Sequence, residues 1–401
     1  MGDKIRKSPN IRFKGFTDDW EQRKLGEVFN EYSEKNHKDL PLLTIIQGNG
    51  TIRRDESDRK MQYDKKSLSN YKMVKKDDFI VHLRSFEGGL EKSNITGIIS
   101  PAYHTLHGEN TDSRFYYAYF RSHNFINIKL KPHVYGVRDG RSIDMTGMKI
   151  INIPFTIINE QNKIGELIES FDNLITIHQC KLELLKDTKK SMLQKMFPKD
   201  GETVPEIRFE GFTDNWEQRK LGETADIISG GTPSTNNSDY WDGDINWYSP
   251  AEIGDEIYVY ESQRKITSLG LEKSSAKILP ADKTILFSSR AGIGTMAILK
   301  APAATNQGFQ SLVIKNSYDT YFVYSMGSLI KQYAEKVASG STFLEISGKT
   351  LGNMDILLPS CDEQEKIGGM FLKIDNLITL HQRELDLLKD LKKSMLKQMF
   401  I

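Results

Sequence analysis

One phrase of 17 residues occurs twice in this chain of 401 residues. IRFKGFTDDWEQRKLGE spans residues 11–27 and IRFEGFTDNWEQRKLGE spans residues 207–223, with two differences between them. A second pair of matching segments lies at 160–197 and 363–400, where 24 of 38 positions are identical. Because equal sequences are expected to fold equally, we predict two copies of one unit. Each copy is much longer than the repeats of a solenoid, so the arrangement predicted is a pseudo-symmetric pair.

The second pair of segments has the periodicity of long helices. Apolar residues recur every seven positions in two interleaved series, which is the pattern of a heptad seam. About 35 residues at ~1.5 Å each predict a rod of roughly 50 Å. Neither helix can hide its seam alone, and the nearest partner is the other copy in the same chain. The predicted seam of the helix pair includes Phe171, Ile175, His178, Leu182, Leu185, Ile374, Ile378, His381, Leu385 and Leu388.

Polar residues interrupt both seams at equivalent places. They are His178 and Lys189 in the first copy and His381 and Lys392 in the second. Two interpretations stay open, a wet part of the seam or residues that fix the register of the pair. We expect no metal at the histidines, because no second ligand is seen three or four residues further on.

The rest of the chain divides around these helices. We predict a first domain at 1–158, a helix at 159–197, a polar linker at 198–206, a second domain at 207–360 and a second helix at 361–401. Both domains show mixed patterns, including a strand followed by a glycine-containing loop and another strand. The predicted fold class is α+β, with two pseudo-symmetric α/β domains joined by two long antiparallel coiled-coil helices. Matching Asp-Asn pairs at 172–173 and 375–376 fall outside the seam in both copies, where solvent or a partner would contact them.

Composition excludes several classes of protein. The sequence holds no 18-residue apolar run and no signal-peptide pattern, so we expect no membrane segment and no export. The two cysteines, Cys180 and Cys361, lack metal spacing and fit a reducing cytoplasm. The net charge of +1 hides an asymmetry: residues 1–200 hold 34 Lys and Arg against 27 Asp and Glu, while residues 201–401 hold 21 against 27. A local basic groove could therefore exist without a basic total.

No catalytic motif stands out. The stretch from Gly292 to Ala297 matches a loose dinucleotide-binding pattern, but no helix is predicted after it, so we interpret it as a turn. The sequence from Asn152 to Phe155 lacks the second proline of an aminomethylase signature, and no phosphate-binding loop is seen. We therefore expect no catalytic residue and no cofactor held by this chain.

Several motifs together resemble the specificity subunits of type I restriction–modification enzymes. They are the W-x-x-x-x-L-G openings at 20–26 and 216–222, the segments 230–254 and 346–359, the paired EQ-x-K-I-G starts and the two helices. The resemblance covers nearly the whole chain. It implies that each variable block is a target recognition domain for half of a split DNA sequence. It also implies that the helices pair antiparallel, hold the domains apart and dock two modification subunits.

The same resemblance implies a non-catalytic subunit of a DNA adenine methyltransferase and type I restriction endonuclease. S-adenosylmethionine, ATP and Mg²⁺ are then expected on partner subunits. The expected partners are double-stranded DNA, two modification subunits and, through the complex, restriction or motor subunits, all in the cytoplasm. A second class of function stays open, a structural adaptor whose helices assemble partner proteins without reading DNA.

Base readout requires hydrogen-bonding side chains on loops, and phosphate contacts require cations. For each candidate the alternative is an ordinary solvated loop. In the first domain the candidates are Arg84, Ser85, Phe86, Tyr135, Arg138 and Arg141, with Lys129 and Lys131 for phosphate. In the second domain they are Ser289, Arg290, Asn306, Gln307, Gln310, Ser339, Ser341 and Thr342.

A helical spacer would also measure DNA. Two reading domains about one helical turn apart, roughly 34 Å, would contact one face of the duplex. The base pairs between them would be measured rather than read. An insertion of four or seven residues near Leu185 is therefore predicted to change the permitted gap between the half-sites.

Overall fold

The structure is a computed structural model that describes residues 8–57, 65–81, 89–135, 142–254, 256–290, 292–340 and 344–400. The chain forms two compact units. Unit 1 holds residues 1–179 together with 383–401, and unit 2 holds residues 180–382. Each unit therefore contains one globular domain, one half of the first long helix and one half of the second.

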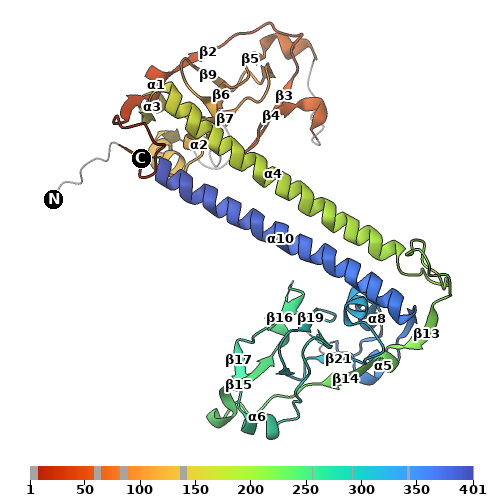
Figure 1. Cartoon of the computed structure of the whole chain (residues 1–401). Helices are drawn as coiled ribbons and strands as arrows, with labels where there is room; N and C mark the ends of the chain where they lie inside the picture. Colours follow the sequence, from red (N-terminus) through yellow and green to blue (C-terminus); the bar gives the residue numbers. More distant parts are fainter. Residues whose placement is uncertain are drawn as a thin grey trace. The chain divides into compact units, whose positions relative to one another are not determined.

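The globular domain of unit 1 consists of short strands and helices (Figure 1). Its largest sheet is antiparallel, with the strand order β2-β9-β6-β7. The elements are β1 (Glu21–Lys24), α1 (Leu25–Val28), β2 (Phe29–Tyr32), β3 (Leu43–Ile46), β4 (Gly50–Arg53), η1 (Arg54–Glu56), η2 (Lys65–Asn70), β5 (Lys72–Val74), β6 (Phe79–Val81), β7 (Glu91–Lys92), β8 (Gly97–Ile99), β9 (His104–Gly108), α2 (Ser113–Phe120), η3 (Asn124–Leu130), η4 (Lys131–His133), β10 (Val134–Tyr135), β11 (Ser142–Ile143), α3 (Met145–Lys149) and β12 (Asn152–Phe155).

The globular domain of unit 2 has a larger mixed sheet. Its five strands follow the order β14-β21-β18-β19-β16, beside a three-stranded sheet in the order β17-β15-β20. The elements are β13 (Glu217–Lys220), α5 (Leu221–Thr224), β14 (Ala225–Ser229), η6 (Ser238–Tyr240), β15 (Trp241–Tyr248), η7 (Pro250–Glu252), β16 (Tyr258–Val259), β17 (Arg264–Ile266), α6 (Ser268–Glu272), β18 (Thr284–Phe287), β19 (Met296–Leu299), β20 (Ala303–Thr305), β21 (Gln310–Ile314), α7 (Thr320–Ser325), α8 (Gly327–Val337), α9 (Gly348–Gly352) and β22 (Asp355–Leu358).

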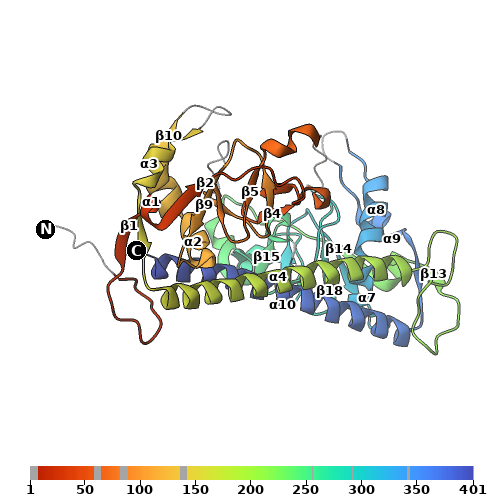
Figure 2. The same ribbon diagram turned by 90° about the horizontal axis from the view of Figure 1, so that it is seen from above.

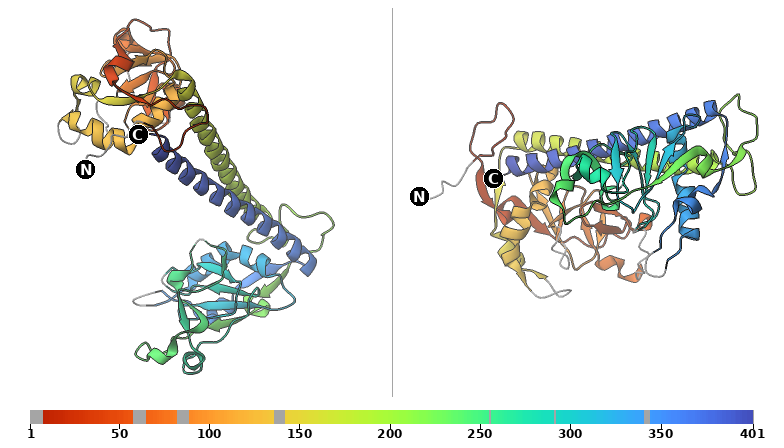
Figure 3. Two further views of the ribbon diagram at one scale, coloured as in Figure 1. Left: turned by 60° about the vertical axis from the view of Figure 1, so that its left-hand side comes forward. Right: turned by 90° about the horizontal axis from the view of Figure 1, so that it is seen from below.

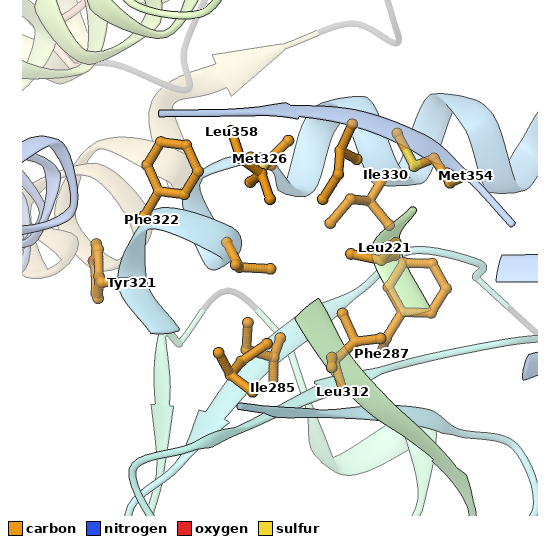
Figure 4. Close-up of a cluster of buried hydrophobic side chains, with 14 of the residues drawn as sticks. Leu221, Ile285, Phe287, Leu312, Tyr321, Phe322, Met326, Ile330, Met354 and Leu358 are labelled. Atoms are coloured by element: carbon orange, nitrogen blue, oxygen red, sulfur yellow. The ribbon is translucent and has the colours of Figure 1, made fainter. Parts of the chain in front are cut away.

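The core of this second domain lies between the five-stranded sheet and the helices α7 and α8. Ile285 and Phe287 of β18 and Leu312 of β21 face Phe322 of α7 and Ile330 of α8 (Figure 4). All five side chains are fully buried. The glycines of the loose dinucleotide pattern lie in the turn between β18 and β19, which pair as an antiparallel hairpin. The interpretation of that pattern as a turn is confirmed.

The two long helices are α4 (Ile158–Lys195) and α10 (Cys361–Met399). In unit 1 the first half of α4 lies beside the second half of α10, in antiparallel directions (Figures 1 and 3). In unit 2 the other two halves pair in the same way. All ten predicted seam residues are buried or half-buried. Such a seam is what a heptad of apolar residues favours.

The repeated phrase forms the same structure at the start of each domain. The strand β1 pairs with β12 in unit 1, and β13 pairs with β22 in unit 2, both antiparallel and in the same register. The next turn is a short helix whose first residue, Leu25 or Leu221, is fully buried. Its backbone nitrogen donates to Ile151 or Met354, respectively, at 2.9 Å in both copies. The arrangement of β1, α1 and α3 in unit 1 is visible in Figure 2.

Each globular core is completed by the end of a helix from the other repeat. In unit 1 the ring of Phe400, just after α10, lies 6.4 Å from Trp20, 5.1 Å from Phe115 and 5.7 Å from Tyr119, measured between ring centres. These distances are typical of aromatic packing. The C-terminus is drawn beside the first domain in Figure 3.

The equivalent residue in unit 2 is Phe197, just after α4. Its ring centre lies 5.9 Å from that of Trp216, 5.4 Å from Phe322 and 6.2 Å from Phe371. Division of the chain into successive segments therefore does not describe its packing. The first core includes Phe400 from the end of the second helix, and the second core includes Phe197 from the end of the first helix. The predicted linear boundaries stay a description of the sequence.

Candidate nucleic-acid and partner-binding surfaces

A buried carboxylate joins the start of α4 to the repeated phrase. Glu160 is fully buried and receives two hydrogen bonds from the Arg12 guanidinium, at 2.5 and 2.9 Å. The indole of Trp20 donates to it at 3.0 Å, and the hydroxyl of Thr156 also donates. Burial alone would raise the pKa of Glu160, but these donors outweigh it and lower the pKa below its usual value.

The second copy repeats this anchor. Arg208 donates to the fully buried Glu363 at 2.7 and 2.8 Å. The following glutamine has the same role twice: Gln161 accepts from the backbone of Asp112, and Gln364 accepts from the backbone of Asp319. These two aspartates cap α2 and α7. The E-Q pair of the repeated start thus fastens each long helix to its own globular domain.

The next glycine of the motif is required by space. A Cβ on Gly165 would lie 2.5 Å from an oxygen of Asp112, and a Cβ on Gly368 would lie 2.2 Å from the equivalent oxygen of Asp319. Only glycine lets the helix approach its capping aspartate so closely. The motif is therefore explained residue by residue in both copies, and it supports a fixed attachment of domain to helix.

Three loops of the second domain meet at the end of β18. The backbone nitrogen of Ser289 donates to Gly308 at 2.8 Å, and that of Ile346 donates to Ser289 at 3.1 Å. The turn after β18, the loop before β21 and the segment after α8 are thus joined. The candidates Ser289, Arg290, Asn306, Gln307, Gln310 and Ser339 all belong to these loops or to their edges.

These candidates differ in how far they reach the surface. Arg290 and Asn306 are half-buried, while Gln307 and Ser339 are exposed. Thr232, which the sequence reasoning did not single out, donates to Gln307 at 2.5 Å. The two glycines just before Thr232, which are typical of a loop, could have indicated this residue from the sequence. Such a mixed polar rim offers both donors and acceptors to base edges.

Two candidates lie below the surface. Ser289 is fully buried and Gln310 is 8% exposed, so neither side chain reaches a duplex without rearrangement. The hydroxyl of Ser289 is buried without a hydrogen-bond partner among the described residues. Ser341 and Thr342 lie outside the described residues. Direct DNA contact by any of these stays a prediction.

In the first domain the described candidates are few. Arg84, Ser85, Phe86, Arg138 and Arg141 all lie outside the described residues. Tyr135 is 59% exposed on the β10–β11 hairpin, and Lys131 is exposed in η4.

Lys129 is already engaged within the domain. Its ammonium donates to the backbone oxygen of Asn152 at 2.7 Å and lies 5.6 Å from the centre of the Tyr119 ring. Burial lowers its pKa. Of the two lysines assigned to phosphate, Lys131 is therefore the better placed.

Unit 1 also holds a basic groove that the sequence reasoning missed. It has a volume of about 1090 Å³ and lies between the first globular domain, α4 and α10. Its rim includes Lys389, Lys393 and Lys397, all exposed and four residues apart on one face of α10. Its floor is apolar and includes Ile168 and Leu396. The regular spacing of these lysines could have indicated the basic rim from the sequence.

Comparison with known proteins decides the family. The sequence profile described as "Type I restriction modification DNA specificity domain" matches residues 17–187 and again residues 213–390. The chain belongs to this type I DNA specificity family. The predicted fold class and the double occurrence of the domain are thereby confirmed.

Individual relatives carry the same family description. The MjaIX specificity subunit of Methanocaldococcus jannaschii is 34% identical over 47% of this chain, and the chain spans only 44% of that relative. A putative MjaX specificity subunit of the same organism is 26% identical over 94% of this chain and 92% of its own length. A crystal structure of the type I S subunit from M. genitalium has a TM-score of 0.64 at 18% identity, over 98% of this chain and 99% of that one. That structure shows a shared fold.

The helices of this specificity protein carry a duplicated exposed apolar face. Leu174, Ile177 and Leu184 are 44%, 48% and 67% exposed, and their counterparts Leu377, Leu380 and Leu387 are 44%, 49% and 68% exposed. The six residues are off the seam of the helix pair. The close match in both copies indicates two equivalent exposed apolar surfaces.

Two expectations about polar helix residues need correction. Asp375 is not in solvent, since it is 4% exposed and pairs with Lys189, and Asp172 pairs with Lys392. A second possible metal ligand does follow one of the histidines, because Glu384 lies three residues after His381, a helical ligand spacing. The absence of a metal stays a prediction. Within the described residues, no helix combines the length and apolar character needed to cross a membrane.

Proposed function

We propose that the chain is the recognition subunit of a type I restriction–modification complex, and that it reads a bipartite DNA target without catalysing a reaction itself. One observation carries this proposal. The anchors and helix starts are nearly identical in the two copies, whereas the globular domains beside them differ in sequence and in the order of their described strands. A duplicated scaffold that holds two dissimilar domains suits the reading of two different half-sites.

The test is to map methylated bases. The chain is assembled with its modification subunits, genomic DNA is methylated, and modified adenines are located by single-molecule sequencing. We expect a split motif with a fixed gap. Exchange of residues 28–159 for those of a relative should change one half-site and leave the other intact. Methylation without sequence preference would instead support the structural adaptor.

The exposed apolar residues of the helices are proposed to dock two modification subunits. One surface is centred on Leu174 and Ile177, and the other on Leu377 and Leu380. Leu174→Ser with Ile177→Ser should reduce the number of bound modification subunits from two to one in native mass spectrometry. Leu269→Ser, at a residue that is 43% exposed on α6, is the matched control and should leave two bound. Two bound subunits in the Leu174 and Ile177 variant would contradict this placement.

The basic groove of unit 1 is proposed to receive an acidic segment of the same modification subunit. An apolar floor with a lysine rim is complementary to an amphipathic helix that carries carboxylates along its edge. Lys393→Glu with Lys397→Glu should weaken assembly and remove part of its salt dependence. The control is Lys190→Glu, because Lys190 is the exposed counterpart of Lys393 in unit 2.

The cofactors are proposed to reside on the partners. S-adenosylmethionine would bind the modification subunits, and ATP with Mg²⁺ would bind the restriction subunits, in the cytoplasm. Calorimetric titration of S-adenosylmethionine into the chain alone should give no binding heat, whereas the assembled complex should give a saturable signal. Binding to the isolated chain would overturn this assignment.

A further inference from the structure

The same ion pair occurs at the helix seam of both units. In unit 2 the ammonium of Lys189 on α4 lies 2.6 Å from one carboxylate oxygen of Asp375 on α10 and donates to the other at 2.8 Å. In unit 1 Lys392 on α10 pairs with Asp172 on α4. Because these residues occupy matching positions of the two repeats, one device is present twice. Each pair joins the two helices directly.

The ion pair in unit 2 is more deeply buried than the one in unit 1. The side chain of Asp375 is 5% exposed, against 54% for that of Asp172. The hydroxyl of Tyr321, on α7, also donates to Asp375 at 2.7 Å. A carboxylate held in this way by two donors is well satisfied, and removal of Lys189 would leave a buried negative charge without the positive charge that faces it.

The apolar seam alone leaves the register of the helices ambiguous. A heptad pattern repeats every seven residues, so a slide of one helix by seven positions again brings apolar residues together. Such a slide would place Gly368 or Gln382, rather than Asp375, opposite Lys189. Neither can neutralise the ammonium. The ion pairs therefore distinguish registers that the apolar residues do not.

We propose that the Lys189–Asp375 and Lys392–Asp172 pairs hold α4 and α10 in one register, and that this register sets the gap between the two DNA half-sites. The second part rests on the proposed function. The helix α4 starts directly after the first domain and α10 directly after the second. A slide of one heptad changes the length between these two starts by about 10 Å. This corresponds to about three base pairs of DNA.

The native cysteines allow the register to be measured. Cys180 lies on α4 and Cys361 is the first residue of α10, both are exposed, and both belong to unit 2. They are the two cysteines of the sequence. Spin labels attached to them in the full chain report the helix offset by double electron–electron resonance. The wild-type protein should give one narrow distance distribution.

Charge reversal supplies the test. Lys189→Asp should broaden the distribution or shift it by about 10 Å, because two carboxylates then face each other. The reciprocal double variant, Lys189→Asp with Asp375→Lys, should restore the narrow distribution. Lys190→Asp, at the adjacent exposed lysine, is the control and should leave it narrow. If Lys189→Asp does not fold, the double variant still decides the question, since a restored pair should restore both folding and distance.

Two results would overturn the proposal. An unchanged narrow distance in a folded protein that carries both Lys189→Asp and Lys392→Asp, and so lacks both pairs, would show that the globular cores alone hold the register. A double variant that stays broad or unfolded would show that the residues act otherwise than as a pair. Methylation mapping then adds the DNA readout: the folded Lys189→Asp protein should accept more than one gap, and a single unchanged gap contradicts the link to DNA. If the wild type shows no split motif, the proposed function fails, while the label distances still decide the register.

Discussion

Arg12 and Glu160 stand 148 positions apart in the chain and meet in a two-pronged ion pair at the start of α4. The carboxylate has no solvent exposure and the guanidinium side chain has 13%. The pair Arg208–Glu363 repeats this with 12% and 0%. Through these contacts the repeated phrase and the repeated helix start, which are distant in sequence, form one joint between domain and helix.

Loss of Arg12 should lower the free energy of unfolding substantially. Arg12→Ala leaves the Glu160 carboxylate buried with only Trp20 and Thr156 as donors, and we expect the free energy of unfolding to fall by about 3–5 kcal/mol. Arg53→Ala is the control, because the ion pairs that Arg53 forms with described residues, Asp55 and Glu56, are exposed. Its effect should be within about 1 kcal/mol. Urea unfolding followed by tryptophan fluorescence measures both, and equal effects would contradict the assignment.

The same carboxylate should make stability depend on pH. The folded state lowers the pKa of Glu160 below its usual value of 4.5. Its stabilisation is therefore complete above that value and is lost as pH falls through the lower pKa of the folded state. Thermal unfolding between pH 6 and pH 3 should show a steeper acid loss for the wild type than for Glu160→Gln. Glu166→Gln, at an exposed residue of the same helix, should keep the wild-type slope.

The aromatic side chain just after α4 should contribute far more to the free energy of unfolding than an apolar side chain on the exposed face of the same helix. Phe197 is 6% exposed within the second core, so Phe197→Ala should reduce the free energy of unfolding by about 3–5 kcal/mol through the cavity that it leaves. Leu184→Ala, at a residue that is 67% exposed, should change it by less than about 0.5 kcal/mol. Similar losses in both variants would contradict the packing of Phe197.

Two basic residues should differ in what they contribute to DNA binding. Arg290→Ala should weaken binding of the assembled complex to its target by about 1–3 kcal/mol and relax the preference at one base position. Lys131→Ala should weaken binding to all sequences alike and reduce the salt slope of log K by about 1. Competition binding against single-base variants at several salt concentrations separates these effects. A change of base preference in Lys131→Ala would overturn its assignment to phosphate.

Local periodicity made the long helices predictable. Their heptads, and the apolar run at 285–287 within β18, depend on neighbours within a few residues, which a single sequence displays directly. The burial of Asp375 was not predictable in this way. An aspartate beside the seam is equally compatible with solvent, and only the approach of Lys189 and Tyr321 from distant parts of the chain removes it from water.

In the candidate site, too, local features could be predicted from the sequence and features that depend on distant contacts could not. Loop positions such as Asn306 and Arg290 could be selected from residue type and nearby glycines, and the structure brings their loops together. Ser289 and Gln310 have suitable chemistry but are buried, because the depth of a residue depends on how separate loops pack over it. The basic groove combines α10 with a domain more than 250 residues earlier, so no local pattern showed its apolar floor.

The crossed insertion of Phe400 and Phe197 has a consequence for synthesis. Trp20 leaves the ribosome some 380 residues before Phe400 does, which at about 5–20 residues per second is roughly 20 to 80 seconds. During that interval the place beside Trp20 that Phe400 occupies is open. The first globular core can therefore be completed only after the last residues of the chain have been made.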